Sequence, residues 1–296
     1  MSGERDLISS LRTLATHPAA RALNDDAAVL EIGGEALVLT HDMMIEGVHF
    51  LRGQDPADVA WKLVAVNLSD LAAKGAEPLG VLLGYQLGRD DARFVEGLCV
   101  ALAAFEVPLL GGDTVGGDGP QALGLTAIGR ATHRPVPSRA GALAGDRVWL
   151  TGPVGAAMVG FDAVRSGLDD PPSRQAFCRP VPLLAEGRAL APHVTAMMDV
   201  SDGLLLDAAR LAAASGACLA LDRAAVPIAA AAEAAGRGED ALRWGDDYQL
   251  LFTLPGTREP PLPAHRIGTV RDPGQFPILL DGAPPDPDRP LGYLHG

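Results

Sequence analysis

Short apolar runs alternate with segments of helical periodicity along the chain, and a stretch without periodicity, residues 133–145, interrupts the alternation near the middle. Apolar runs bounded by turn residues are typical of strands, and apolar positions spaced by three or four are typical of helices. The pattern predicts mixed sheets flanked by helices, an α/β fold of the α+β type. The interruption contains two prolines, so we place a domain boundary there. With 296 residues, the chain is long enough for an N-terminal domain over 1–138 and a C-terminal domain over 139–296.

The expected elements are assigned by their apolar spacing and their capping residues. The predicted strands are 27–32, 36–40, 79–87, 107–110, 122–131, 147–151, 195–199, 218–222, 248–254, 266–270 and 277–280. The predicted helices are 4–15, 56–74, 90–105, 156–166, 183–191 and 203–214. Gly33-Gly34 predicts a hairpin between the first two strands, which brings Asp25 and Asp26 at one strand start near Asp42 at the end of its partner.

The helix over residues 56–74 carries a polar stripe on an otherwise apolar sequence. Asn67, Asp70 and Lys74 share this stripe through spacings of three and four residues. An aspartate in the middle of a helix rich in Ala, Leu and Val lowers helix propensity and requires a partner. This favours a ligand role for Asp70 over a structural one.

Several aspartates stand at predicted strand ends or beside glycine. They are Asp25, Asp26, Asp42, Asp113, Asp199, Asp202, Asp246 and Asp247. One such aspartate is more often a helix cap or turn residue than a ligand, but their repetition exposes carboxylates at one rim of a sheet. Mg²⁺ takes oxygen ligands and shares them among carboxylates, water and substrate phosphates. The sequence therefore predicts a site for several Mg²⁺ ions.

The charge and composition of the chain limit the binding partners and the compartment that we expect. The formal net charge of −13 argues against nucleic acid, and an acidic protein that binds phosphates would need divalent cations to do so. The three cysteines are far apart and odd in number, the N-terminus is polar, and no apolar run reaches the ~18 residues of a membrane span. We expect a cytoplasmic protein without a membrane partner.

Familiar catalytic and nucleotide motifs are missing. Glycine-rich stretches at residues 111–114, 115–119 and 152–155 could cradle phosphate, above all where a helix begins after Gly155. The sequence contains neither a Walker pattern nor a dinucleotide-binding glycine pattern, and it lacks the His-Arg-Asp loop of protein kinases and a Gly-x-Ser-x-Gly elbow. No catalytic side chain is assigned beyond the metal cluster.

Several segments resemble the thiamine-monophosphate kinase family, in the family's order and over nearly the whole chain. They are residues 24–29 (with Asn24-Asp25-Asp26), 40–50, 67–76 (with Asn67-Leu68-Ser69-Asp70), 111–114 (Gly-Gly-Asp-Thr), 198–204 (with Val-Ser-Asp-Gly) and 245–252. The family belongs to the aminoimidazole-ribonucleotide synthase superfamily. The resemblance implies that superfamily's two-domain fold and a homodimer formed through N-terminal strands.

The resemblance also implies an activity and a set of site residues. The activity is the ATP-dependent phosphorylation of thiamine monophosphate to thiamine diphosphate, by Mg²⁺-assisted in-line transfer that needs no strong general base. The implied metal ligands are Asp26, Thr40, His41, Asp42, Asp70, Asp113, Asp199 and Asp202. The implied ATP contacts are Gly112, Asp113, Arg139 and Ser201, and the implied substrate contacts are His49, Asp246 and Tyr293.

The chain departs from the family pattern in three places. Asn24 replaces a usual Gly, His41 a usual Thr, and Trp244-Gly245-Asp246-Asp247 stands where Gly-Gly-Glu-Asp is usual. Two alternatives stay open: another enzyme of the superfamily, or a noncatalytic ATP- and Mg²⁺-binding regulator. Selenophosphate synthetase is disfavoured because it normally carries a reactive cysteine or selenocysteine near the N-terminus, whereas the first cysteine here is Cys99. The hydrogenase-maturation dehydratase is disfavoured because it carries a C-terminal cysteine, whereas this sequence ends Gly-Tyr-Leu-His-Gly.

Overall fold

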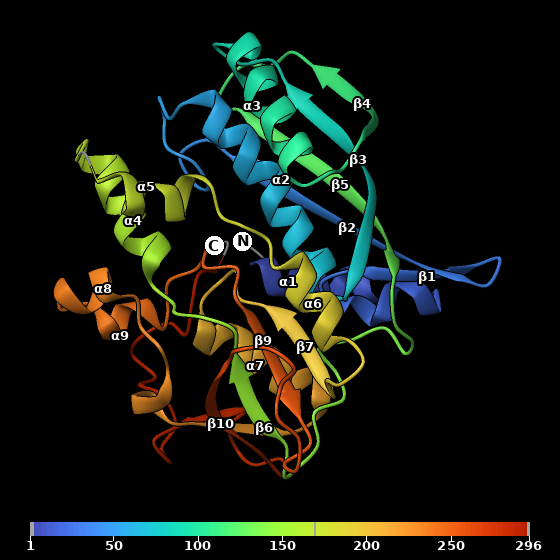
Figure 1. Cartoon of the computed structure of the whole chain (residues 1–296), viewed down its shortest axis with the longest axis vertical. Coiled ribbons are helices and arrows are strands. Elements are labelled where there is room, and N and C mark those ends of the chain that lie inside the picture. Colours follow the sequence, from blue (N-terminus) through green and yellow to red (C-terminus); the bar gives the residue numbers. More distant parts are fainter. Residues whose placement is uncertain (1–2, 169, 295–296) are drawn as a thin grey trace.

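The computed structural model describes residues 3–168 and 170–294, which form two mixed sheets flanked by helices (Figure 1). The first sheet has the order β1-β2-β5-β3-β4, and only β3 and β4 pair in parallel. Its strands are β1 (Ala28–Ile32), β2 (Glu35–Ile45), β3 (Ala76–Gln86), β4 (Leu109–Val115) and β5 (Ala122–Ala131). The two sheets and their helices confirm the predicted fold class.

The second sheet has the order β11-β8-β10-β6-β9-β7. Its strands are β6 (Arg147–Leu150), β7 (Ala196–Asp199), β8 (Cys218–Leu221), β9 (Leu250–Leu254), β10 (His265–Arg271) and β11 (Ile278–Leu280). All its neighbouring pairs are antiparallel except β8 and β11. Each sheet has its own apolar core, in keeping with two separate layers of packing.

The first hairpin forms as its glycines require, but its second strand is longer than predicted. Gly33 and Gly34 have φ of 59° and 86°, the left-handed values of a two-residue hairpin turn that glycine adopts without strain. The prediction ended β2 at residue 40, whereas the strand continues to Ile45. Asp42 thus lies inside the strand, where alternation sends its side chain to the same face as the buried Met44.

Helix α2 (Pro56–Ala73) is the central element between the two halves (Figure 1). The Asp55 carboxylate accepts a hydrogen bond from the Ala57 N–H at 3.0 Å, which is the predicted N-cap. The helix packs against the first sheet and α3 (Asp91–Ala104) and also contacts α6 (Leu184–Leu190) and β7 of the second half. Because other elements cover α2 on all sides, polar side chains on its surface lie in the interior between the two halves.

The remaining helices belong mostly to the second half. They are α4 (Ala156–Ser166), α5 (Pro171–Cys178), α7 (Leu204–Ser215), α8 (Ala230–Ala234) and α9 (Gly238–Ala241), with 3₁₀ turns at Pro18–Leu23 and Arg223–Ala225 and the N-terminal α1 (Glu4–Arg12). The sequence prediction missed α5, α8 and α9, which have eight, five and four residues and too few turns for a clear period. It also extended the first helix beyond Arg12.

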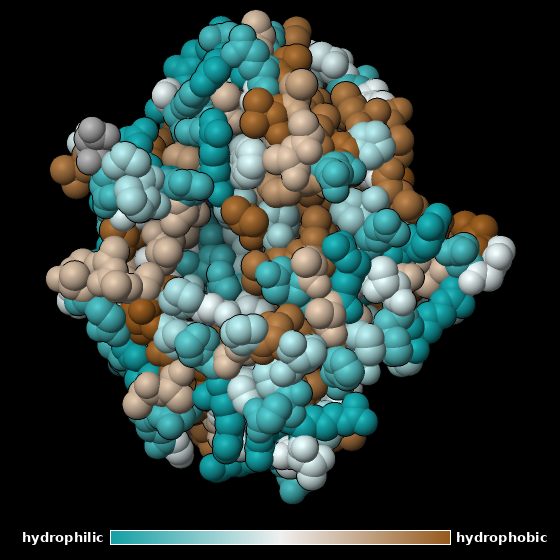
Figure 2. Space-filling view, viewed as in Figure 1, coloured by the Kyte–Doolittle hydropathy of each residue, from teal (hydrophilic) through white to brown (hydrophobic). Residues whose placement is uncertain are grey.

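The first sheet has one face covered by helices and one that exposes apolar side chains. Met43, Ile45, Leu82, Leu110 and Val115 are all exposed, and every residue of the edge strand β4 is exposed. In Figure 2 brown side chains gather over the region of β3, β4 and β5. A surface of this kind is typical of a protein–protein contact.

Two further observations concern compartment and membrane. Among residues 3–168 and 170–294, no helix combines the length and apolarity needed to cross a bilayer. All three cysteines are free thiols: Cys99 is exposed, and Cys178 and Cys218 are buried.

Candidate active site

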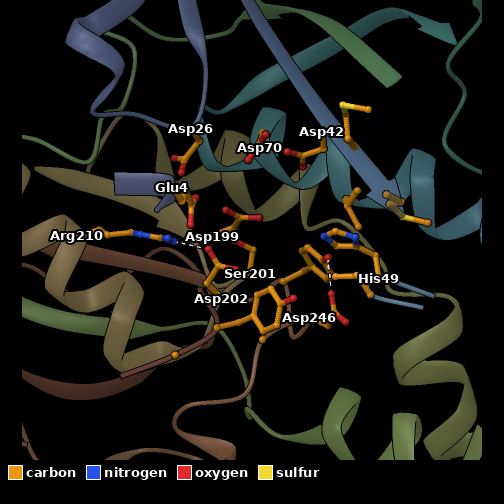
Figure 3. A pocket seen from close by; sticks show the side chains of 18 of the residues that line it. Glu4, Asp26, Asp42, His49, Asp70, Asp199, Ser201, Asp202, Arg210 and Asp246 are labelled. Carbon is orange, nitrogen blue, oxygen red and sulfur yellow. Dashed lines mark hydrogen bonds and ion pairs between the residues drawn. The ribbon is translucent and has the colours of Figure 1, made fainter. Parts of the chain in front are cut away.

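A cavity of about 1130 Å³ lies between the two halves and collects most of the predicted site residues. Asp26, Asp42, Asp70 and His49 enter it from the first half, as Figure 3 shows. The second half contributes a further set: Arg139, Asp199, Ser201, Asp202, Asp246 and Tyr293. The volume is large enough for two small ligands, and the lining has a different character at its two ends.

One end of the cavity is acidic. Asp26 precedes β1, Asp70 lies on α2 and Asp199 ends β7, yet each places a carboxylate oxygen within 4.8 Å of the other two. Asp42 and Asp202 line the same end (Figure 3). Three elements that are far apart in sequence therefore converge on one point, and their carboxylates could hold a cation there.

Burial and mutual repulsion make these carboxylates hard to ionise. Burial, followed by the charges of Asp26 and Asp202, raises the pKa of Asp42 to about 6. Burial and the nearby Asp26 raise the pKa of Asp199 to about 8. Burial and the charge of Asp42 raise the pKa of Asp70 well above its usual value, although the Thr40 hydroxyl donates a hydrogen bond to its Oδ2. Clustered acids with raised pKa values are typical of a functional site.

Basic side chains lie directly against Asp25 and Asp26. The Lys74 ammonium lies 2.5 Å from Asp25 Oδ1 and 2.6 Å from Asp26 Oδ2, and Arg139 Nε donates to Asp26 Oδ1 at 2.7 Å. Burial opposes ionisation of Asp25, but Lys74 and Arg21 outweigh it and hold its pKa below the usual value. Lys74 and Arg139 together therefore balance the charge of Asp26 on both of its carboxylate oxygens.

The loop after β7 is fixed by the helix that follows it. The buried Asp207 on α7 accepts hydrogen bonds from the N–H groups of Ser201 at 3.1 Å and Asp202 at 3.0 Å. Arg210 Nη1 bridges Asp202 Oδ2 at 2.5 Å and Asp207 Oδ1 at 2.9 Å. These contacts hold Ser201 and Asp202 at the cavity wall, which the spacing of residues 199–203 alone did not reveal.

The other end of the cavity is aromatic. Its lining includes His49, Phe161, Phe177, Trp244 and Tyr248. The rings of Phe161 and Phe177 pack edge to face with centroids 5.4 Å apart, and Phe161 lies 5.3 Å from Trp244. Such a wall suits the faces of flat rings in a ligand. Trp244, which replaces a usual Gly of the family pattern, is thus part of this wall.

A polar group closes the aromatic end. Asp246 Oδ2 accepts a hydrogen bond from Lys62 Nζ at 2.8 Å, and Asp246 Oδ1 accepts one from the Tyr248 hydroxyl at 2.8 Å. Lys62 Nζ also donates to the carbonyl oxygen of His49 at 3.0 Å. The backbone of Asp246 has a φ of 67°, a left-handed value that a non-glycine residue adopts only when its surroundings hold it there.

Four predicted residues do not line the cavity. Thr40 is buried behind it and contacts Asp70. The ring of His41 lies on the exposed face of the sheet, with Nδ1 2.9 Å from the Thr126 hydroxyl. Gly112 and Asp113 lie on the exposed strand β4, where they are remote from the acidic end within one copy of the chain.

One glycine-rich stretch has a structural role instead of the predicted phosphate contact. The buried Asp247 carboxylate accepts hydrogen bonds from the N–H groups of Gly155 at 2.7 Å and Ala157 at 3.4 Å and so caps α4. Burial raises the pKa of Asp247 to about 7. Because the protein's own carboxylate occupies these donors, the prediction of a phosphate cradle at this helix is wrong.

Other lining residues were missed by the sequence analysis. Glu4 points into the acidic end from α1, and Arg210 reaches it from α7 (Figure 3). Lys62 reaches the aromatic end from α2. Their signal in the sequence is weak, because a charged residue on an amphipathic helix is normally solvated and only the packing of the second half on α2 changes that.

Comparisons with known proteins agree with this geometry. Residues 24–131 match the AIR synthase related protein, N-terminal domain, and residues 144–276 match the AIR synthase related protein, C-terminal domain. The thiamine-monophosphate kinase of Escherichia coli K12 is 35% identical over 251 residues, covering 79% of this chain and 76% of that protein. That of Haemophilus influenzae is 30% identical and covers 99% and 98%.

Solved structures give the same result. The structure described as "AaThiL complexed with AMPPCP and TMP" superimposes with a TM-score of 0.90 at 30% identity, covering 99% of this chain and 97% of that one. The hydrogenase maturation protein HypE in complex with ATP has a TM-score of 0.69 at 23% identity, which indicates a shared fold.

Proposed function

This chain belongs to the AIR synthase related family and, within it, to the thiamine-monophosphate kinases, and we propose that it uses ATP to phosphorylate thiamine monophosphate to thiamine diphosphate. The observation that carries the proposal is the two-ended cavity: carboxylates suited to metal-bound phosphates at one end and aromatic rings suited to flat heterocycles at the other. A neighbour at a TM-score of 0.90 was solved with AMPPCP and TMP, an ATP analogue and an acceptor.

The donor set at the acidic end fits Mg²⁺. Three carboxylate oxygens, one each from Asp26, Asp70 and Asp199, lie within 4.8 Å of one another. Hard oxygen ligands of this kind are those that Mg²⁺ prefers, and bound ions would neutralise charge between the two anionic substrates. The proposed ligands remain Asp26, Thr40, His41, Asp42, Asp70, Asp113, Asp199 and Asp202, with His41 contributing its backbone carbonyl because its side chain points away from the cavity.

The chain's own residues position the two substrates. We assign Arg139 and Ser201 to the nucleotide, since both line the acidic end, and His49, Asp246 and Tyr293 to the acceptor. An acceptor phosphate is already ionised at neutral pH, so transfer needs alignment and charge neutralisation more than a base. For this reason we assign no histidine or lysine as a catalytic base.

Two departures from the family pattern are compatible with the proposal. Asn24 has a φ of −110°, which any residue adopts, so the usual glycine is not required there. Its Oδ1 accepts a hydrogen bond from Arg12 Nη2 at 2.5 Å, which ties α1 to the site. Asp246 is shorter than the usual Glu, but Lys62 and Tyr248 hold its carboxylate at the cavity wall.

We also propose that the protein is a homodimer joined through the first sheet. The exposed apolar side chains of β2, β3 and β4 support this, because a second copy would cover them and the open edge of β4. Gly112 and Asp113 lie on that strand, so we assign their ATP and metal contacts to the cavity of the other copy. Mass measurement by light scattering tests the dimer.

The boundary between residues 138 and 139 and a cytoplasmic location complete the proposal. The strands of the first sheet end at Ala131 and those of the second begin at Arg147, which supports a boundary within the stretch between them. Free thiols and the supply of ATP and Mg²⁺ in the cytoplasm support the location.

The deciding experiment follows ADP release and thiamine diphosphate formation with ATP, thiamine monophosphate and Mg²⁺. Thiamine in place of its monophosphate and a metal-free reaction are the controls. Product that requires both the monophosphate and the metal supports the kinase. ATP binding without any product would instead favour a noncatalytic regulator or a sister enzyme.

A further inference from the structure

Lysine is used in an unusual way in this chain. Of the 24 basic residues only Lys62 and Lys74 are lysines, and the others are arginines. Both lysines belong to α2 or its C-cap, and both side chains are almost completely buried, with 1% and 0% exposed. Lys62 lines the cavity at its aromatic end, whereas Lys74 lies behind Asp25 and Asp26 at the acidic end.

Lys62 connects three separate segments at the aromatic end. Its Nζ lies 2.8 Å from Asp246 Oδ2 and 3.0 Å from the His49 carbonyl oxygen. The same atom lies 3.8 Å from the centroid of the Phe177 ring on α5. One ammonium group thereby joins a helix of the first half to the turn after β2, to α5 and to the loop before β9.

The chemistry of the site explains why the residue is a lysine. An ammonium is a compact charge with three donors, whereas a guanidinium is a broad planar fork. Two oxygens and a ring face surround Nζ in a space without solvent, which suits the smaller group. A buried charge of this kind is kept only if its partners need it, because removing it leaves the partner carboxylate uncompensated.

We propose that Lys62 is the positioning residue of the acceptor end: it acts through Asp246 and the His49 turn to hold them in the arrangement that binds the acceptor substrate. The proposal rests on the proposed kinase function and assigns a role to a residue outside the proposed ATP and metal contacts. Asp246, held at a left-handed φ between Lys62 and Tyr248, keeps its carboxylate directed at the cavity. Without Lys62, the Tyr248 hydroxyl alone would hold this carboxylate.

The test compares two lysine-to-methionine variants on the same helix. Lys62→Met removes the ammonium at the acceptor end, and Lys74→Met removes an equally buried ammonium at the acidic end. For Lys62→Met we expect the KM for thiamine monophosphate to rise about tenfold or more, while the KM for ATP changes less than about twofold. For Lys74→Met we expect a changed Mg²⁺ requirement without this selective rise. Calorimetric titration with thiamine monophosphate gives the same comparison without turnover.

A double-mutant cycle separates positioning from packing. If Lys62 acts through Asp246, then Lys62→Met should add little to the loss already caused by Asp246→Asn. Lys62→Gln, which keeps a donor of similar length but no charge, should lie between the wild type and Lys62→Met. It also provides a variant if Lys62→Met does not fold.

The outcomes distinguish failure of the proposed function from failure of the role proposed for Lys62. A wild-type protein that makes no thiamine diphosphate refutes the proposed function. An active wild type with an unchanged KM for thiamine monophosphate in both Lys62 variants refutes the positioning role alone. Equal losses for both substrates, or additive losses in the cycle, would show that Lys62 serves general packing and also overturn the inference.

Discussion

Asp42→Asn should make the metal-free protein more stable while it destroys the activity. Asp42 lies inside β2 and faces Asp26 and Asp202 across the cavity, and burial together with these charges raises its pKa from 3.8 to about 6. Asparagine keeps the size and one acceptor but removes the charge. Burial disfavours the charged carboxylate in the folded state, so the wild type loses stability above the pKa that Asp42 has in the unfolded chain. The substitution removes this loss.

The size of this loss of stability follows from the change in the pKa of Asp42. A pKa raised by about 2 units corresponds to about 3 kcal/mol, since each unit is worth about 1.36 kcal/mol. The cost is absent below about pH 4, grows as the pH rises to about 6 and is constant above it. With an unfolding entropy of about 2 cal/mol/K per residue, the variant should melt about 5 °C higher than the wild type at pH 8 and equally at pH 4.

Thermal unfolding in EDTA at pH 4, 6 and 8 measures the effect, and the same scans with Mg²⁺ measure metal binding. Mg²⁺ should stabilise the wild type more than Asp42→Asn, because ligand binding to the folded state raises stability by mass action. Turnover should fall about a hundredfold or more if a metal ligand is lost. A variant that melts at or below the wild type at pH 8, or one that retains its activity, would refute this account of the cluster.

Three further substitutions test other parts of the structure. Asp25→Asn should lower the stability of the fold, whereas Asp42→Asn should raise it. The low pKa of Asp25 stabilises the fold above pH 4, so loss of this charge beside the buried Lys74 should lower the free energy of unfolding in urea by about 3 kcal/mol at pH 7 and by much less at acid pH. Leu110→Arg places a charge on an exposed apolar side chain of β4 and should convert the dimer to a monomer in light scattering, with unchanged circular dichroism. Gly187→Ala should lower the free energy of unfolding by about 1–3 kcal/mol, because the added Cβ would lie 1.9 Å from the carbonyl oxygen of Ala72 where α6 crosses α2. An unchanged midpoint of urea unfolding would show that the two helices separate easily.

Local patterns predicted the fold well where elements are long and regular. Helix α4 and strand β5 begin and end at the predicted residues, because glycine and apolar spacing mark their limits clearly. The error at β2 has a physical cause: Asp42 interrupts the apolar pattern, although the strand continues because that carboxylate faces a cavity instead of solvent. Short helices such as α5 have too few turns to show a period.

The site was predictable as a set of aspartates and not as a geometry. A helix position among apolar neighbours marked Asp70, and strand ends marked Asp199. Nothing local marked Asp207, Lys62 or Arg210, whose roles arise only when the second half packs against α2. Residues that touch ligands leave a signal in composition and spacing, whereas residues that position them depend on tertiary contacts.

The buried carboxylates at the acidic end divide into two groups by their basic partners. Asp25 and Asp26 are neighbours in sequence, and both face Lys74, so their charge is balanced inside the protein. Asp42, Asp70 and Asp199 lack a comparable partner among the described residues, and their pKa values are raised accordingly. Within the cavity, the carboxylates without a basic partner therefore lie together, where the two anionic substrates would meet. Arg139 pairs with Asp26 and Arg210 with Asp202, so the basic side chains of the cavity leave Asp42, Asp70 and Asp199 for cations, and we expect the proposed reaction to depend on Mg²⁺.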